Sequence, residues 1–351
     1  MHLKFNFGMA GLVLIISLPL SSCSFDFKKH AKAQRCSKLF AYQRKTKTTP
    51  ELEQEFYNVN KRFAGEGIFF LDFYRTVGEK HCGEPSNSYV QFVKGISENK
   101  PQTEFLSLVR QVDTAIHETA HGFSSDAKKY EHYIAGVNKK GAQSGHGLTT
   151  SIYLKKTGIR HLRHTASFPA RKITNYIKDQ SLLKQARYKV YIQPSLHNHV
   201  TQRHGIYGLL DEYHAYYYSV LTDNNILRQL NSEQRRIYTG PDRAFITVGQ
   251  NDNSLSYLQF TTYILSYFRV AEKEYPAIYQ QMLANRELLD VFIALHDNFE
   301  KIYRESQRLV KKDKKAKDYF SGQRKALVEE LKQPDNQRML RKIRRENRKA
   351  V

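Results

Sequence analysis

The residues best able to do chemistry in this chain are His117, Glu118 and His121, which form the pattern His-Glu-Thr-Ala-His. In an α-helix, positions i and i+4 lie on one face, so both imidazoles can bind one metal ion at the ~2.0 to 2.1 Å typical of zinc. Glu118 directly follows the first histidine, where its carboxylate can contact a metal-bound water without binding the metal itself. The spacing therefore predicts one Zn²⁺ ion, with Glu118 as the general base of a hydrolytic reaction.

The segment around this pattern has the periodicity of a buried helix. After Pro101, apolar residues recur at the i, i+3 and i+4 spacing, at Phe105, Leu108, Val109, Val112, Ala115, Ile116 and Ala120. We expect this helix to end near His121 and Gly122. The alternative is a solvated cluster of His and Glu, but such side chains are costly to bury without partners, which favours a metal site.

Through His117, Glu118 and His121 the chain resembles the zincin superfamily of zinc metallopeptidases. The extended metzincin pattern would have Gly at position 124 and His at position 127, whereas this chain has Ser124 and Ala127. The resemblance is therefore to the gluzincin branch, in which a glutamate of a later helix is the third ligand. It implies a metallohydrolase that cleaves a peptide or protein substrate.

The best match for that glutamate is Glu212, which lies in the aromatic segment 206–221, itself a predicted helix. A carboxylate buried in an aromatic helix needs a nearby cation. Asp211 is a weaker ligand candidate, and could instead accept a hydrogen bond from a ligand histidine. The spacing of 91 residues between positions 121 and 212 leaves histidines as further alternatives, namely His146, His204 and His214.

Hydrolysis also needs a donor that stabilises the developing oxyanion, a task that zincins often give to a Tyr or His near the metal. Tyr216 is our candidate for this catalytic role, beside Tyr217, His214 and His204. Aromatic residues at helical spacing are usually core residues, so the assignment stays open.

The N-terminus has the pattern of an export signal. A hydrophobic stretch from Phe5 to Leu20 is too short for a membrane span, and the following Leu20-Ser21-Ser22-Cys23 resembles the lipobox of bacterial lipoproteins. This predicts a signal peptide over 1–22 and lipidation of Cys23; an ordinary cleaved signal or a buried helix is the alternative. In the Gram-negative lipoproteins that this pattern resembles, Asp after the cysteine favours retention at the inner membrane. Because residue 24 is Ser, the resemblance implies a cell-envelope protein anchored to the outer membrane and facing the periplasm.

Lipidation of Cys23 leaves two cysteines, Cys36 and Cys82, in an oxidising compartment. An even pair of cysteines in such a compartment predicts a disulfide between them, and two free thiols are the alternative.

The rest of the chain reads as one α+β domain, mostly helical. We predict a basic tether over 23–49, a zincin-like metallohydrolase domain with a small sheet over 50–300, and a basic helical tail over 301–351. Strands are expected at 148–154, a candidate edge for binding an extended peptide, and at 188–192. Helices are expected at 51–64 and 206–221 and, with a break near Pro276, over 255–320; 78–87 is expected to be a loop.

The charge suggests a second function. The 56 Lys and Arg exceed the 34 Asp and Glu by 22, so the protein should attract anionic partners. The alternative to an enzyme is thus a non-catalytic envelope lipoprotein that binds anionic polymers or a protein partner. Nucleic acid is disfavoured because the export signal removes the protein from the cytoplasm.

Overall fold

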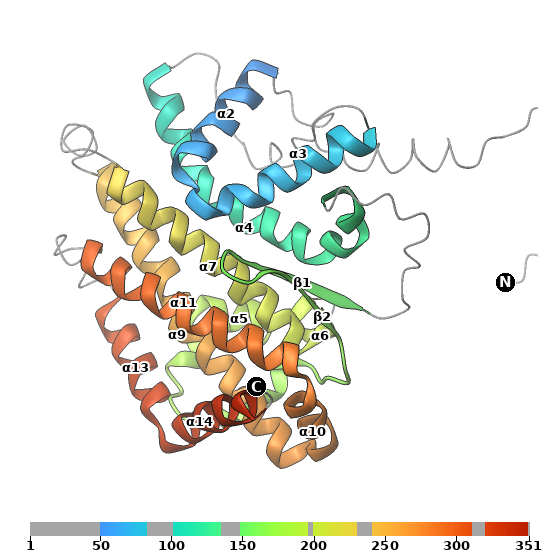
Figure 1. The fold of residues 1–351 in the computed structure, drawn as a ribbon. Coiled ribbons are helices and arrows are strands. Elements are labelled where there is room, and N and C mark those ends of the chain that lie inside the picture. The colour runs from blue at the N-terminus through green and yellow to red at the C-terminus, as the bar shows by residue number, and fades with distance from the viewer. Residues whose placement is uncertain are drawn as a thin grey trace, which may run out of the picture.

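The computed structural model describes residues 50–82, 101–134, 148–195, 199–229, 241–310 and 320–349. Over these residues the protein is mostly helical, with one two-stranded sheet (Figure 1), so the predicted mostly helical α+β class is confirmed. The predicted signal peptide, the lipidation residue Cys23 and the tether 23–49 lie outside the described residues. None of the described helices is long and apolar enough to span a bilayer.

The helices follow the chain in this order: α2 (Pro50–Phe63), α3 (Ile68–Cys82), α4 (Pro101–Ile134), α5 (Ala186–Tyr191), α6 (Val200–His204), α7 (Ile206–Gln229), α9 (Pro241–Glu274), α10 (Pro276–Ala284), α11 (Arg286–Val310), α13 (Ser321–Lys332) and α14 (Pro334–Arg348). Short 3₁₀ helices are η1 (Gly65–Gly67), η3 (Ala170–Tyr176) and η4 (Leu182–Lys184). The predicted break near Pro276 is confirmed, because α9 ends at Glu274 and proline, which lacks an N–H, begins α10.

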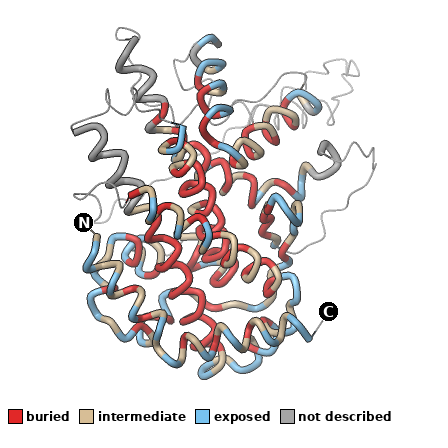
Figure 2. The backbone as a smooth tube through the Cα atoms, turned by 60° about the vertical axis from the view of Figure 1, so that its left-hand side comes forward, coloured by how far each residue is buried: buried red, intermediate tan, exposed pale blue. Residues whose placement is uncertain are grey.

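Helix α7 is the centre of the molecule. It packs against α4, α9 and α11, and its side chains are buried on all sides over most of its length. Figure 2 shows this buried core of helices surrounded by half-exposed ones. A helix that is apolar around its whole circumference is stable only when neighbouring elements cover every face. The many aromatic residues of 206–221 fit this central position.

The sheet is an antiparallel hairpin of β1 (Thr149–Leu154) and β2 (Gly158–Arg163), and it packs on α4 and α7. The predicted strand at 148–154 is confirmed, whereas the sequence reading missed β2. His214 Nε2 lies 3.2 Å from the backbone N and 3.1 Å from the backbone O of Tyr153, and the Tyr218 hydroxyl donates to the same carbonyl. The outer edge of β1 is therefore already bonded to α7 at Tyr153, which shortens the edge open to a peptide.

Three predictions about the elements were wrong: one strand, one loop and the end of one helix. Residues 188–192 are not a strand: α5 covers 186–191 and buries Arg187 and Tyr188 while Lys189 and Val190 are exposed. A five-residue apolar alternation fits a strand and a helical turn equally well, so the pattern alone could not decide. The loop expected from Gly78 is instead the last turn of α3 as far as Cys82.

The predicted end of α4 near Gly122 was also wrong, since the helix continues to Ile134. A Cβ atom on Gly122 would lie 2.6 Å from the Tyr74 hydroxyl oxygen, so the glycine allows α3 to pack closely on α4. It serves helix packing at this position, and not helix termination.

Cys82 is disulfide-bonded. Cys36, its predicted partner, lies outside the described residues, so the pairing stays a prediction.

The described part of the predicted basic tail is helical. Helices α13 and α14 pack on α9 through the buried side chains of Leu327, Met339 and Ile343. These two helices are therefore part of the helical body.

Candidate metal centre

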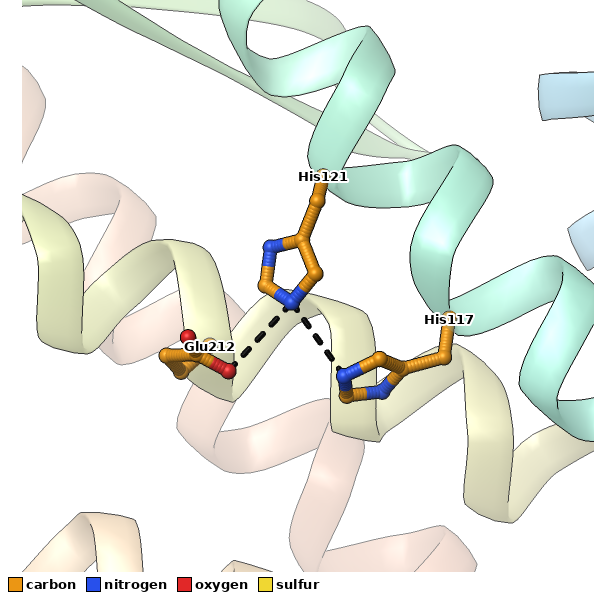
Figure 3. Close-up of side chains that lie close together, drawn as sticks. All are labelled: His117, His121 and Glu212. Atoms are coloured by element: carbon orange, nitrogen blue, oxygen red, sulfur yellow. Dashed lines mark hydrogen bonds and ion pairs between the residues drawn. The ribbon is translucent and has the colours of Figure 1, made fainter. Parts of the chain in front are cut away.

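Three sequence-predicted ligands come together between α4 and α7. His117 Nε2 lies 3.2 Å from His121 Nε2, and His121 Nε2 lies 3.3 Å from Glu212 Oε2 (Figure 3). One ligand atom from each residue lies within 4.8 Å of the others. Two ligands bound tetrahedrally at ~2.0 to 2.1 Å are separated by roughly 3.3 Å, so these spacings match those of a zinc site.

The helices position these side chains by simple geometry. His117 and His121 are one turn apart on α4, so they share the face that packs on α7. Glu212 lies on α7 opposite them and is only 4% exposed. The site is therefore built from two neighbouring core helices, which hold the ligands rigidly.

The chemistry of Glu212 fits a cation. Its Oε2 atom is buried and makes no hydrogen bond of good geometry among the described residues; it has only the ion-pair contact with His121 Nε2 at 3.3 Å. A buried carboxylate oxygen is unfavourable without strong partners, and a divalent ion between Glu212 and the two imidazoles would supply one. The residues present thus fit a zinc ion.

Asp211 has a different role from its neighbour. The His121 imidazole donates from Nδ1 to Asp211 Oδ2 over 2.9 Å, so Nε2 is the ring nitrogen that faces the ligand group. Burial opposes the ionisation of Asp211, but the His121 ring outweighs it and lowers the pKa of this carboxyl. Asp211 is thus placed as the hydrogen-bond acceptor that a ligand histidine needs.

The two histidines differ in their tendency to take up a proton. Burial lowers the pKa of His117 well below its usual value, and the neighbouring His121 lowers it further. Burial also acts on His121, but Asp211 and Glu212 overcome it and raise the pKa of His121 well above its usual value. His117 is therefore neutral, and the ring nitrogen that carries no proton is available to a metal.

Glu118 is exposed on α4, and it is not among the three residues whose ligand atoms converge. Its predicted role as the general base stays a prediction.

Tyr216 lies at the edge of the site. Its ring centroid is 4.5 Å from that of His117, and its hydroxyl lies 2.9 Å from the Tyr191 hydroxyl. The Arg187 guanidinium lies over the Tyr216 ring at 4.7 Å and is bound by Asp252 at 3.0 Å. Tyr216 is thus held between a second hydroxyl and a buried cation.

The sequence reading missed three residues at the site: Arg187, Tyr191 and His199. His199 Nε2 lies 3.9 Å from Glu212 Oε1, and His199 Nδ1 accepts from the backbone N–H of Thr201 over 3.3 Å. His199 Nδ1 also lies 2.9 Å from the Thr201 hydroxyl oxygen, so two contacts with Thr201 hold the ring with Nε2 toward Glu212. The available signal was the concentration of histidines just before the helix that contains Glu212.

The remaining candidates are not in the ligand group. His214 is bonded to the backbone of Tyr153, and His204 contacts the His164 ring at 5.2 Å. Tyr217 packs against Tyr218 and Phe299 in the core. His146 lies outside the described residues.

A second group with metal-ligand side chains lies on α11, at His296, Asp297 and Glu300. Its carboxylates are already paired: Arg344 bonds Asp297 at 2.6 Å, and Arg304 bonds Glu300. The charge is therefore balanced without a metal.

Comparison of the chain with protein-family models, with curated proteins and with solved structures found no match.

Proposed function

We propose that the chain is a zinc-dependent hydrolase, most simply a zincin-like peptidase, held at the cell envelope by a lipid on Cys23. The observation that supports this is the ligand group of His117, His121 and Glu212, in which the buried Glu212 Oε2 has no other described partner.

A zinc ion held by this group would polarise the scissile carbonyl and acidify a water molecule. With the ion bound, Glu118, the exposed carboxylate beside His117, would act as the general base that takes a proton from water and gives it to the leaving amine. Asp211 holds the His121 ring so that Nε2 faces the group.

Two side chains are the candidates for stabilising the oxyanion. They are Tyr216, whose ring contacts His117 and whose hydroxyl contacts Tyr191, and His199, whose Nε2 lies 3.9 Å from Glu212 Oε1. One preorganised donor of this kind contributes about 100- to 1000-fold to turnover.

The test of the proposed function is Glu118→Gln. This variant should lose at least about 100-fold in the rate of casein hydrolysis, because the general base is gone, while its zinc content by mass spectrometry stays at that of the wild type. The matched control is Glu79→Gln, which makes the same change on the exposed face of α3 and should retain full activity.

The net charge of +22 supports the second candidate, a non-catalytic envelope protein that binds an anionic polymer or a protein partner. If that candidate is right, casein is not cleaved by the wild type and Glu118→Gln changes nothing that can be measured.

A further inference from the structure

The segment that joins α4 to α7 beside the candidate metal centre has few acidic residues to balance its basic ones. Residues 148–204, which join α4 to α7 through β1, β2, η3, α5 and α6, contain eleven Lys and Arg but a single acidic residue, Asp179. The same segment contributes Tyr191 and His199 to the site. The segment therefore has ten more basic than acidic residues.

Most of this charge faces solvent. Of the eleven basic residues only Arg187 is buried. Lys155 is paired with Glu66 and Lys178 with Asp335, both away from the site. For Lys172, Lys189 and Arg203, the part of the chain that the structure describes offers no ion-pair partner, so these cations are available to a ligand.

A cavity of about 420 Å³ lies among η3, α5 and α6, and we call it the basic pocket. Its walls are Arg171, Lys172, Ile192, Gln193, Pro194 and Gln202.

The basic pocket is tied to the residues of the site through Gln202. The Gln202 amide donates to the backbone carbonyls of Tyr191 at 3.1 Å and Ile192 at 3.2 Å, and its Oε1 accepts from the backbone N–H of Arg171 at 3.2 Å. Gln202 lies on the same short helix that His199 caps. A ligand in the pocket is thus next to the elements that hold Tyr191 and His199 against the metal ligands.

We propose that the basic pocket binds a carboxylate of the substrate, so that the enzyme prefers acidic peptides. The Arg171 guanidinium and the Lys172 ammonium, with the Gln193 amide beside them in one concave site, match a small carboxylate in charge. The inference rests on the proposed peptidase function, because that function is what makes the ligand a peptide.

The test measures binding separately from cleavage. Glu118→Gln protein is titrated with three fluorescein-labelled octapeptides of one sequence: one with two Glu residues and an amidated C-terminus, one with Gln in their place, and the Gln peptide with a free C-terminus. The Glu peptide should bind about tenfold more tightly than the amidated Gln peptide, and the difference should shrink at high salt. Tight binding of the Gln peptide with a free C-terminus would identify the terminal carboxylate as the group bound.

The pocket is tested by Arg171→Ala with Lys172→Ala, in the Glu118→Gln background. Both side chains are exposed, so the fold should be kept, and affinity for the carboxylate-bearing peptide should fall about tenfold. The control is Lys184→Ala, which removes the same charge from the same basic segment but lines a different cavity beside α13, and it should leave affinity unchanged.

Equal binding of all three peptides, or an equal loss in Lys184→Ala, would overturn the inference. The two proposals fail separately. Charge-selective binding without casein hydrolysis by the wild type supports the pocket and removes the peptidase, whereas hydrolysis without any charge preference removes only the pocket.

Discussion

Asp211 and Glu212 are adjacent carboxylates with different surroundings. Consecutive residues on a helix are about 100° apart, so Glu212 faces the two Nε2 atoms while Asp211 meets the far side of the His121 ring. The same functional group thus serves as a ligand candidate at one position and as a hydrogen-bond acceptor at the next. The difference follows from the direction of each side chain and not from residue type.

This difference predicts unequal effects on zinc affinity. Glu212→Gln removes an anionic ligand and should lower affinity by more than about 100-fold, whereas Asp211→Asn should lower it by about 10- to 100-fold. Affinity is measured by competition with a chromogenic chelator. Asp297→Asn, in the group whose charge is balanced by Arg344, is the control and should bind zinc as the wild type does. Unchanged affinity in Glu212→Gln would remove this residue from the site.

At the scale of elements, the contact between α6 and α7 decides where His199 lies. Gly205, with φ of +54°, makes the turn between the two helices, a backbone conformation that favours glycine. A Cβ atom on Gly208 would lie 2.5 Å from the Val200 carbonyl oxygen. The two helices approach this closely only because position 208 has no side chain.

Gly208→Ala should therefore push α6 away from α7. We expect a loss of about 1 to 3 kcal/mol in the free energy of unfolding, measured in urea, and a lower turnover number because His199 moves from Glu212. Gly322→Ala is the matched control: nothing lies within 4 Å of its Cβ position, so it should be neutral or slightly stabilising. Wild-type stability in Gly208→Ala would contradict this account of the contact.

At the scale of the whole molecule, the core that packs α7 also buries ionisable side chains far from the site. His296 on α11 is 5% exposed and lies between the rings of Tyr257 and Phe292. Burial lowers its pKa to about 4; Asp297 and Glu300 oppose this and Arg344 adds to it. The imidazole is thus held neutral by the packing of the core.

This burial predicts a loss of stability in acid. As pH falls from about 6.5 to about 4, unfolded His296 takes up a proton and the folded form does not, so the unfolded state is favoured by up to about 3 kcal/mol. His296→Phe should have a shallower decline over this window, measured by urea unfolding at successive pH values. Parallel curves for the two proteins would show that His296 does not contribute.

How far the elements could be predicted depended on the length of each pattern. The long stripe after Pro101 predicted α4, and the alternation at 148–154 predicted β1. Shorter signals failed, since α5 has only six residues and its pattern fits two structures. The role of Gly122 could not be predicted from the sequence, because the glycine is needed for a close contact with Tyr74 on another helix.

The sequence by itself determined that His117 and His121 share a helical face, because a four-residue spacing on one helix leaves no other arrangement. It also made Glu212 a ligand candidate, since an acid in an aromatic helix needs a partner. Only the tertiary structure decided that Glu212 meets the histidines and that Tyr191 and His199 join them. The reason is that these contacts cross from one element to another, and helix packing, which no local spacing encodes, sets the distances between elements.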